Sequence, residues 1–121
     1  MNATAVQRIE PVLSASAQPN EFDRKRIERA LAKRKRYRYV SPSVHAVADG
    51  YRIDSPCCSR NVDPEGGVVD VALLQFVPGS RPWSLYRKEH ASQQWRLHSY
   101  YQRLPELLEQ LNADPQRLFW Q

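Results

Sequence analysis

Hydrophobic residues recur with a helical period near the start of the chain. An apolar stripe, which the aliphatic stem of Arg34 continues, consists of Phe22, Ile27, Ala30 and Leu31. Asn20 is a candidate N-cap, and Glu21 and Asp23 lie in the first turn, where the positive end of the helix dipole favours acidic side chains. The pattern predicts a helix that begins near Asn20 and gives way to extended chain before Pro42.

Apolar runs in the middle of the chain predict four antiparallel strands, at residues 44–54, 68–77, 83–90 and 94–101. Asp49 and Gly50 mark a bulge or a turn within the first of these strands. The second run is apolar on both of its faces, which favours a central position in the sheet. The last two runs are joined by a short connection and are predicted to form a hairpin.

The last part of the chain predicts a leucine-rich helix and a tail that docks on the core. Pro105 and Glu106 suit the first turn of a helix. The apolar stripe of this helix consists of Leu104, Leu107, Leu108 and Leu111. Asp114 and Pro115 are the expected cap and first residue of a final turn. Three large apolar residues follow them and should pack against the core, namely Leu118, Phe119 and Trp120.

These elements predict an α+β fold with an N-terminal basic helix, a four-stranded antiparallel sheet and a C-terminal leucine-rich helix packed on one face of that sheet. A length of 121 residues fits one domain, which we expect to span residues 21–121. Residues 1–20 are rich in Ala and Ser, contain Pro11 and Pro19, and lack periodicity. We therefore expect them to form a disordered N-terminal tail.

The net charge of +5 is concentrated in one segment. Between Glu21 and Tyr39 nine basic residues accompany three acidic ones, whereas the rest of the chain holds nine basic and ten acidic residues. Cations interleaved with Tyr37 and Tyr39 favour an anionic partner, because cations contact phosphates and aromatic rings stack on bases. The sequence therefore predicts a non-enzymatic binding domain whose favoured partner is nucleic acid. The expected contact residues are Arg24, Lys25, Arg29, Lys33, Arg34, Lys35, Arg36 and Arg38.

Three other interpretations stay open. The basic segment could be a solvated helix face followed by an arm whose tyrosines cover the sheet. It could instead dock on an acidic surface of another protein, which would make the chain an accessory domain. An RNA-cleaving enzyme of the toxin type would use side chains predicted to share one face of the hairpin, namely Tyr86, Lys88, His90, Arg96, His98 and Tyr100. That set matches no spaced motif, and such residues commonly serve as cross-strand pairs.

Cysteine usage and ligand spacing predict no metal site. The only cysteines are Cys57 and Cys58, which are adjacent and form no disulfide framework. His45, Asp54 and Asp63 could join them, but no second CxxC pair or HxxxH spacing completes a tetrahedral zinc site. No GxSxG motif supports a serine hydrolase. We therefore expect no cofactor, no metal and no catalytic residue.

The chain contains no basic leader followed by an apolar run, and no stretch approaches about 18 apolar residues. We therefore expect a cytoplasmic protein without a membrane segment.

Several motifs resemble a known family. They are an opening "RIERAL", a "GYRI", an aromatic hairpin "WSLYRKEHASQQWRLHSYY", a helix "LPELLEQL" and the end "ADPQRLFW". From about Arg26 to Gln121 the chain resembles the small bacterial proteins of domain of unknown function 3024. Gln121 departs from the glycine that is usual in the family, and the Cys57–Cys58 loop replaces what is often a charged strand edge. The resemblance implies a single domain with these boundaries and implies no activity.

Overall fold

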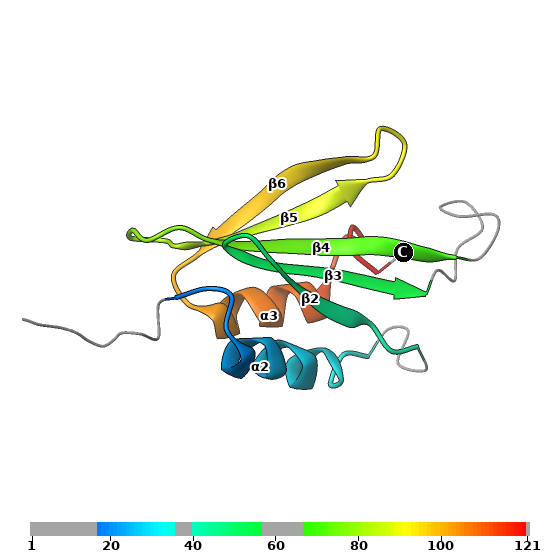
Figure 1. Cartoon of the computed structure of the whole chain (residues 1–121). Coiled ribbons are helices and arrows are strands. Elements are labelled where there is room, and N and C mark those ends of the chain that lie inside the picture. Colours follow the sequence, from blue (N-terminus) through cyan, green and yellow to red (C-terminus); the bar gives the residue numbers. More distant parts are fainter. Residues whose placement is uncertain (1–16, 36–39, 57–66, 121) are drawn as a thin grey trace, which may run out of the picture.

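The computed structural model describes residues 17–35, 40–56 and 67–120. In chain order its elements are α2 (Glu21–Leu31), β2 (Ser43–Val47), β3 (Gly50–Pro56), β4 (Val68–Phe76), β5 (Trp83–Glu89), β6 (Gln94–Tyr101) and α3 (Leu104–Ala113). The strands form one antiparallel sheet in the order β2-β3-β4-β5-β6, so every strand pairs with its neighbours in sequence. Both helices lie on the same side of this sheet (Figure 1).

The predicted α+β fold is confirmed, but the sheet has five strands and not four. The segment predicted as one strand at 44–54 forms two, β2 and β3, because the chain reverses at Ala48 and Asp49 in a turn and not a bulge, and Gly50 begins β3. Val47 pairs with Gly50 across this two-residue hairpin. Asp49 has a φ of 61°, the left-handed geometry that such tight hairpins require.

Gly50 is needed for a second reason, which is the closeness of the neighbouring strand. A Cβ atom at this position would lie 1.8 Å from the carbonyl oxygen of Leu74 on β4. Only glycine allows the two backbones to approach in this way, and the turn between β2 and β3 is thereby tied to the central strand.

The hydrophobic core lies between the two helices and one face of the sheet. The helices contribute Ile27 and Leu31 from α2 and the predicted leucine stripe of α3, all of them buried. The sheet contributes Val44, Tyr51, Ile53, Ala72, Leu74, Trp83 and Leu85. The ring of Trp83 packs against Phe76 and Tyr51, with centroid distances of 5.1 and 6.4 Å.

The N-terminal helix presents a different residue to the core than its predicted stripe indicates. Phe22 is 71% exposed, whereas Asp23 is buried. The reason is the helical phase: Asp23, Ile27 and Leu31 are four residues apart and so share one face, which excludes Phe22. Asp23 is satisfied there, because its carboxylate accepts hydrogen bonds from Gln18 and Asn20.

The described chain contacts the sheet from Gln18 onwards, three residues before the predicted domain start at residue 21. The backbone N–H of Asn20 donates to the Tyr51 hydroxyl at 2.9 Å, and that hydroxyl donates to the side-chain oxygen of Gln18. Asn20 also caps α2 as predicted, since its side chain accepts the Asp23 N–H at 2.7 Å. Residues 1–16 of the predicted tail lie outside the described residues.

The prediction that the C-terminal tail docks on the core is confirmed. Asp114 ends α3 with a φ of 38°, and its buried carboxylate accepts hydrogen bonds from the backbone N–H groups of Leu118, Phe119 and Trp120. The Trp120 indole N–H donates to the Leu111 carbonyl at 2.9 Å. Phe119 and Trp120 are thereby held in the core, at 4% and 2% exposure.

The close approach at Gly50 predicts the effect of a single added methyl group. We expect Gly50→Ala to lower the free energy of unfolding by about 2 kcal/mol or more, because Leu74 or the hairpin must move. Gly79→Ala is the matched control, since its Cβ would lie 3.9 Å from the Val77 carbonyl oxygen and should change stability by less than about 0.5 kcal/mol. Urea unfolding of both variants checks this, and equal stabilities would show that the strand contact is loose.

Candidate functional site

Helix α2 carries a row of exposed cations. Lys25, Arg29 and Lys33 are four residues apart, so they lie along one side of the helix and of the turn that follows it in the chain. Lys35 lies two residues after Lys33. All four residues are exposed. Within the described parts of the chain, none of them has a carboxylate at ion-pair distance. We call Lys25, Arg29, Lys33 and Lys35 the α2 row.

Two other arginines of the helix are engaged with its acidic residues. Arg24 pairs with Glu21 and also with Glu28, whose carboxylate lies 2.7 Å from its guanidinium. Its hydrogen bond to Glu21 raises the pKa of Arg24 and lowers the pKa of Glu21. Arg26 pairs with Asp23 at 3.1 Å. Arg24, which was predicted to contact the partner, is thus partly neutralised by acidic residues of its own helix.

Arg34 is a correction to the predicted contact residues, because it lies inside the protein. Its residue is only 4% exposed. The guanidinium donates to the carbonyl oxygens of Leu31 and Val40, at 2.8 and 2.7 Å, and lies 4.5 Å from the centroid of the Trp120 ring. Burial lowers the pKa of Arg34. This arginine joins the end of α2 to the tail, and a surface partner cannot reach it.

The remaining predicted residues of the basic segment, Arg36 and Arg38, lie outside the described residues, as do Tyr37 and Tyr39. The candidate metal ligands Cys57, Cys58 and Asp63 lie outside them as well. Among the residues that the structure describes, no group of three or more His, Cys, Asp or Glu side chains could hold a metal ion.

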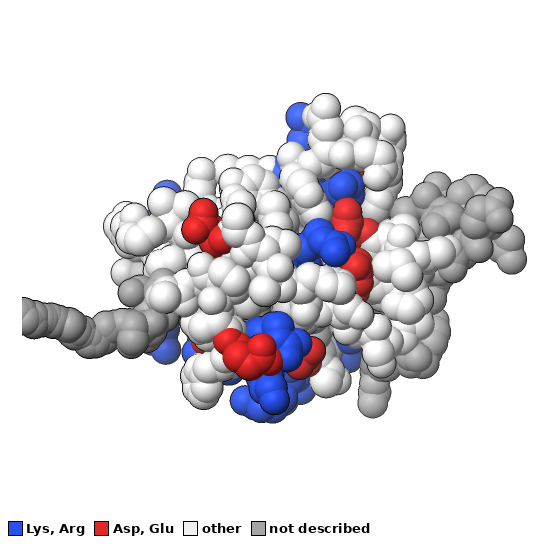
Figure 2. Space-filling view, in the orientation of Figure 1, with Lys and Arg blue, Asp and Glu red and all other residues white. Residues whose placement is uncertain are grey.

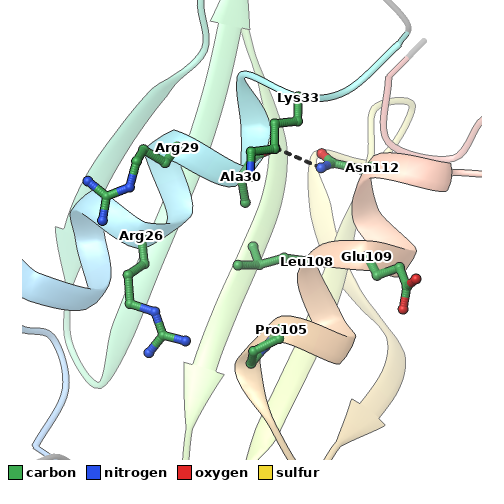
Figure 3. Close-up of a pocket in the computed structure, with 8 residues that line it drawn as sticks. All are labelled: Arg26, Arg29, Ala30, Lys33, Pro105, Leu108, Glu109 and Asn112. Carbon is green, nitrogen blue, oxygen red and sulfur yellow. Dashed lines mark hydrogen bonds between the residues drawn. The ribbon is translucent and has the colours of Figure 1, made fainter.

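A groove of about 550 Å³ runs between α2 and α3 beside the α2 row. Its residues are Arg26, Arg29, Ala30, Lys33, Pro105, Leu108, Glu109 and Asn112. Figure 3 shows Leu108 pointing from α3 towards α2, while Glu109 points away. The Asn112 side chain donates to the Ala30 carbonyl at 2.8 Å and so bridges the two helices. The groove thus has cations along α2, while its α3 side combines the apolar Pro105 and Leu108 with the polar Glu109 and Asn112.

The hairpin side chains considered for RNA cleavage do not all share one face of the sheet, so the predicted arrangement of these side chains is wrong. Leu85 pairs with Ser99, but Tyr86 pairs with Leu97, which leaves His98 as an extra residue in β6. This bulge shifts the side-chain alternation of β6. Tyr86, Lys88 and Tyr100 lie on the face away from the helices. Arg96 pairs with Arg87 on the other face, and the ring of His98 contacts Phe119 at 5.1 Å.

A charge network crosses the sheet on the face away from the helices. Arg52 on β3 pairs with Asp54 and with Asp70 on β4, at 2.9 and 2.8 Å, and Asp70 pairs with Lys88 on β5 at 3.0 Å. His45 on β2 extends the network to Asp54 at 3.0 Å. In Figure 2 acidic and basic side chains adjoin one another over the strands, and again over α2 at the bottom of the view.

The central carboxylate of this network stays ionised. Burial raises the pKa of Asp70, but the hydrogen bonds from Lys88 and Arg52 outweigh that effect, so the pKa lies below its usual value. His90 shares a polar pocket of about 340 Å³ with Asp70 and Lys88, and its pKa is lowered by burial and by the charge of Lys88. The sequence analysis did not predict this network. Arg52 and Asp54 are two residues apart in one strand, so their side chains were expected to lie on the same face of the sheet, and this was the available signal.

The interior position of Arg34 predicts a stability effect that its neighbour lacks. We expect Arg34→Ala to lower the free energy of unfolding by about 3 kcal/mol, because it removes a desolvated cation–π contact and the side-chain hydrogen bonds to the carbonyl oxygens of Leu31 and Val40. Lys33→Ala, which removes an exposed cation one residue away, should change stability by less than about 0.5 kcal/mol. Thermal unfolding of the two variants checks this. An Arg34→Ala protein as stable as Lys33→Ala would contradict the buried placement.

Comparisons with known proteins place the chain in a family. No described helix is long and apolar enough to span a membrane. A comparison with curated proteins found no match, and a comparison with solved structures found none either. The model of the family described as Domain of unknown function (DUF3024) matches residues 15–121. This range agrees with the described fold, which begins with the turn before α2 and ends with the docked tail. The chain therefore belongs to the DUF3024 family.

Proposed function

We propose that this protein is a non-enzymatic binding domain whose partner is nucleic acid and whose contact surface is the α2 row. The observation that carries the proposal is the exposure of four cations in one row with no carboxylate partner among the described residues. Arg24 and Arg26 stand beside the row but are engaged with acidic residues. The row therefore offers positive charge that the domain does not use internally.

The geometry of the row suits a phosphate backbone. Successive members of the row on α2 are four residues apart, which corresponds to about 6 Å along the helix axis. Lysine and arginine side chains are long enough to contact different phosphates from such positions. Contacts of this kind position a protein on nucleic acid without reading its sequence, so we expect binding with little base preference.

The helix is held rigidly enough to present such a row. Ile27 and Leu31 anchor it in the core, Asn20 and Tyr51 hold its start, and Arg34 holds its end. A fixed row of cations loses less conformational entropy on binding than a flexible basic arm does.

A second candidate function is docking of an acidic segment of another protein, which the apolar side of the α2–α3 groove favours. Pro105, Leu108 and Ala30 line that groove together with Arg29 and Lys33. A phosphate backbone gains nothing from apolar carbon, whereas an acidic peptide with apolar side chains would use both features.

Charge reversal of the row tests the proposal. We expect the triple variant Lys25→Glu, Arg29→Glu, Lys33→Glu to bind a fluorescent DNA duplex at least roughly tenfold more weakly at about 50 mM KCl, because three phosphate contacts become repulsive. The wild-type affinity should fall steeply between about 50 and 200 mM KCl, and the slope should decrease by about three in the variant. Fluorescence anisotropy measures both quantities.

The matched control keeps every charge. The triple variant Lys25→Arg, Arg29→Lys, Lys33→Arg should bind the duplex like the wild type. If the charge-reversed protein binds DNA and RNA duplexes as tightly as this control, the proposal is wrong. If the charge-reversed protein keeps its nucleic-acid binding but no longer binds a glutamate-rich peptide that the wild type binds, the result would support docking of an acidic protein segment as the function.

A further inference from the structure

The face of the sheet that points away from α2 and α3 carries aromatic side chains. Strand register places three neighbouring cross-strand pairs of β5 and β6 on it, namely Ser84 with Tyr100, Tyr86 with Leu97 and Lys88 with Trp95. Among the described elements, both helices pack on the opposite face (Figure 1). We call these six residues, together with Arg81, the β5–β6 face.

The apolar part of this face is open to solvent. Tyr100 is 47% exposed and Leu97 is 45% exposed, while Tyr86 and Trp95 are half-buried. Same-face residues of a strand are about 7 Å apart, so the rings form a line along the hairpin and not a single cluster.

Cations flank the rings on the same face. The Lys88 ammonium lies 4.7 Å from the centroid of the Trp95 ring, and the Arg81 guanidinium lies 5.4 Å from that of Tyr100. The side chain of Lys88 is only 12% exposed, because its ion pair with Asp70 holds it down against the sheet. The two outer rings, Trp95 and Tyr100, are therefore each held by a neighbouring cation, and their orientation on the hairpin is fixed before any ligand binds.

This combination suits a ligand that has both flat apolar groups and negative charge. A single-stranded nucleic acid offers unpaired bases, which stack on aromatic rings, and phosphates, which pair with Lys and Arg. A duplex keeps its bases stacked inside and would leave the rings unused. The α2 row, in contrast, has a single exposed ring near it on the helix, Phe22, and the Arg26 guanidinium lies 5.8 Å from the centroid of that ring.

We propose that the β5–β6 face binds single-stranded nucleic acid, with bases stacking on Tyr86, Trp95 and Tyr100 and a phosphate contacting Arg81, while Lys88, which is paired with Asp70, holds the Trp95 ring in place. The inference shares the ligand class of the proposed function and extends it to a second surface. It does not require the α2 row, because the two surfaces lie on opposite sides of the molecule, α2 below the sheet in Figure 1 and the β5–β6 face on the other side.

Tryptophan fluorescence of the full chain gives a direct test. Trp83 and Trp120 are buried, at 5% and 2% exposure, so Trp95 is the tryptophan that a stacked base can reach. Adding an oligothymidylate of about 15 nucleotides should quench the emission, and the quenching should disappear in Trp95→Phe. Binding that leaves the tryptophan emission of the wild type unchanged would overturn the proposal.

An exposed ring on each side of the molecule gives a matched pair of variants. We expect Tyr100→Ala to weaken binding of the oligothymidylate roughly tenfold, because one stacking platform is lost. Phe22→Ala, which removes a 71% exposed ring from α2, should leave that affinity unchanged. Both residues are exposed, so both variants should fold, which circular dichroism checks. Equal affinities for the two variants would overturn the proposal.

The charge-reversed α2 variant separates the two proposals. If it loses duplex binding but keeps the Trp95 quenching by oligothymidylate, both surfaces act as proposed. If it binds duplex normally while Tyr100→Ala weakens oligothymidylate binding, the β5–β6 face stands and the α2 row falls. If the face instead contacts a second copy of the chain, Tyr100→Ala will change the sedimentation coefficient and the oligothymidylate will leave Trp95 emission unchanged, which overturns the proposal.

Discussion

Packing of both helices on the same face of the sheet is the constraint on which the rest of this structure depends. Ile27 and Leu31 of α2 and the leucine stripe of α3 cover Tyr51, Ile53, Leu74 and Leu85, and these contacts remove most of the large aliphatic side chains from water. Burial of this apolar surface is the main source of folding free energy in a domain of this size. It also leaves the opposite face of the strands to polar and aromatic residues.

The two sides of the domain have consequently different chemistry. On the helical side, α2 divides its residues between an interior face and a cationic exterior, and Arg34 belongs to the interior because it contacts Trp120 and the carbonyl oxygens at the end of the helix. On the open side, Arg52, Asp54, Asp70 and Lys88 neutralise one another in a network across the strands. The aromatic residues of the β5–β6 face continue that surface towards the edge of the sheet.

The order of elements and the fold class could be predicted from periodicity alone, since the helical and strand stripes are long and clear. The number of strands could not, because Asp49 and Gly50 suit both a bulge and a turn, and only the pairing of Val47 with Gly50 shows that the chain reverses there. The exposure of Phe22 followed from a helical phase that the buried Asp23 shares with Ile27 and Leu31. This helical phase buries an aspartate and exposes a phenylalanine, so hydrophobicity alone gives the wrong burial for both residues.

The candidate sites show the same limit. A count of charges singled out residues 21–39 as basic, but it could not tell the exposed Lys33 from the buried Arg34 beside it. Simple alternation failed in the hairpin, because the extra residue His98 moves Arg96 and His98 away from Tyr86 and Lys88. The β5–β6 face was visible only after the register was known. Irregularities of one residue therefore decide which side chains can act together.

The central claim is that opposite sides of the domain contact nucleic acid in different ways. The most direct measurement is a nuclear magnetic resonance titration of isotope-labelled full chain with oligothymidylate and, separately, with a DNA duplex. The account predicts that oligothymidylate shifts the backbone resonances of Tyr86, Lys88, Trp95 and Tyr100, and that the duplex shifts those of Lys25, Arg29 and Lys33. Shifts confined to other surfaces with both ligands, or no shifts with either, would contradict it.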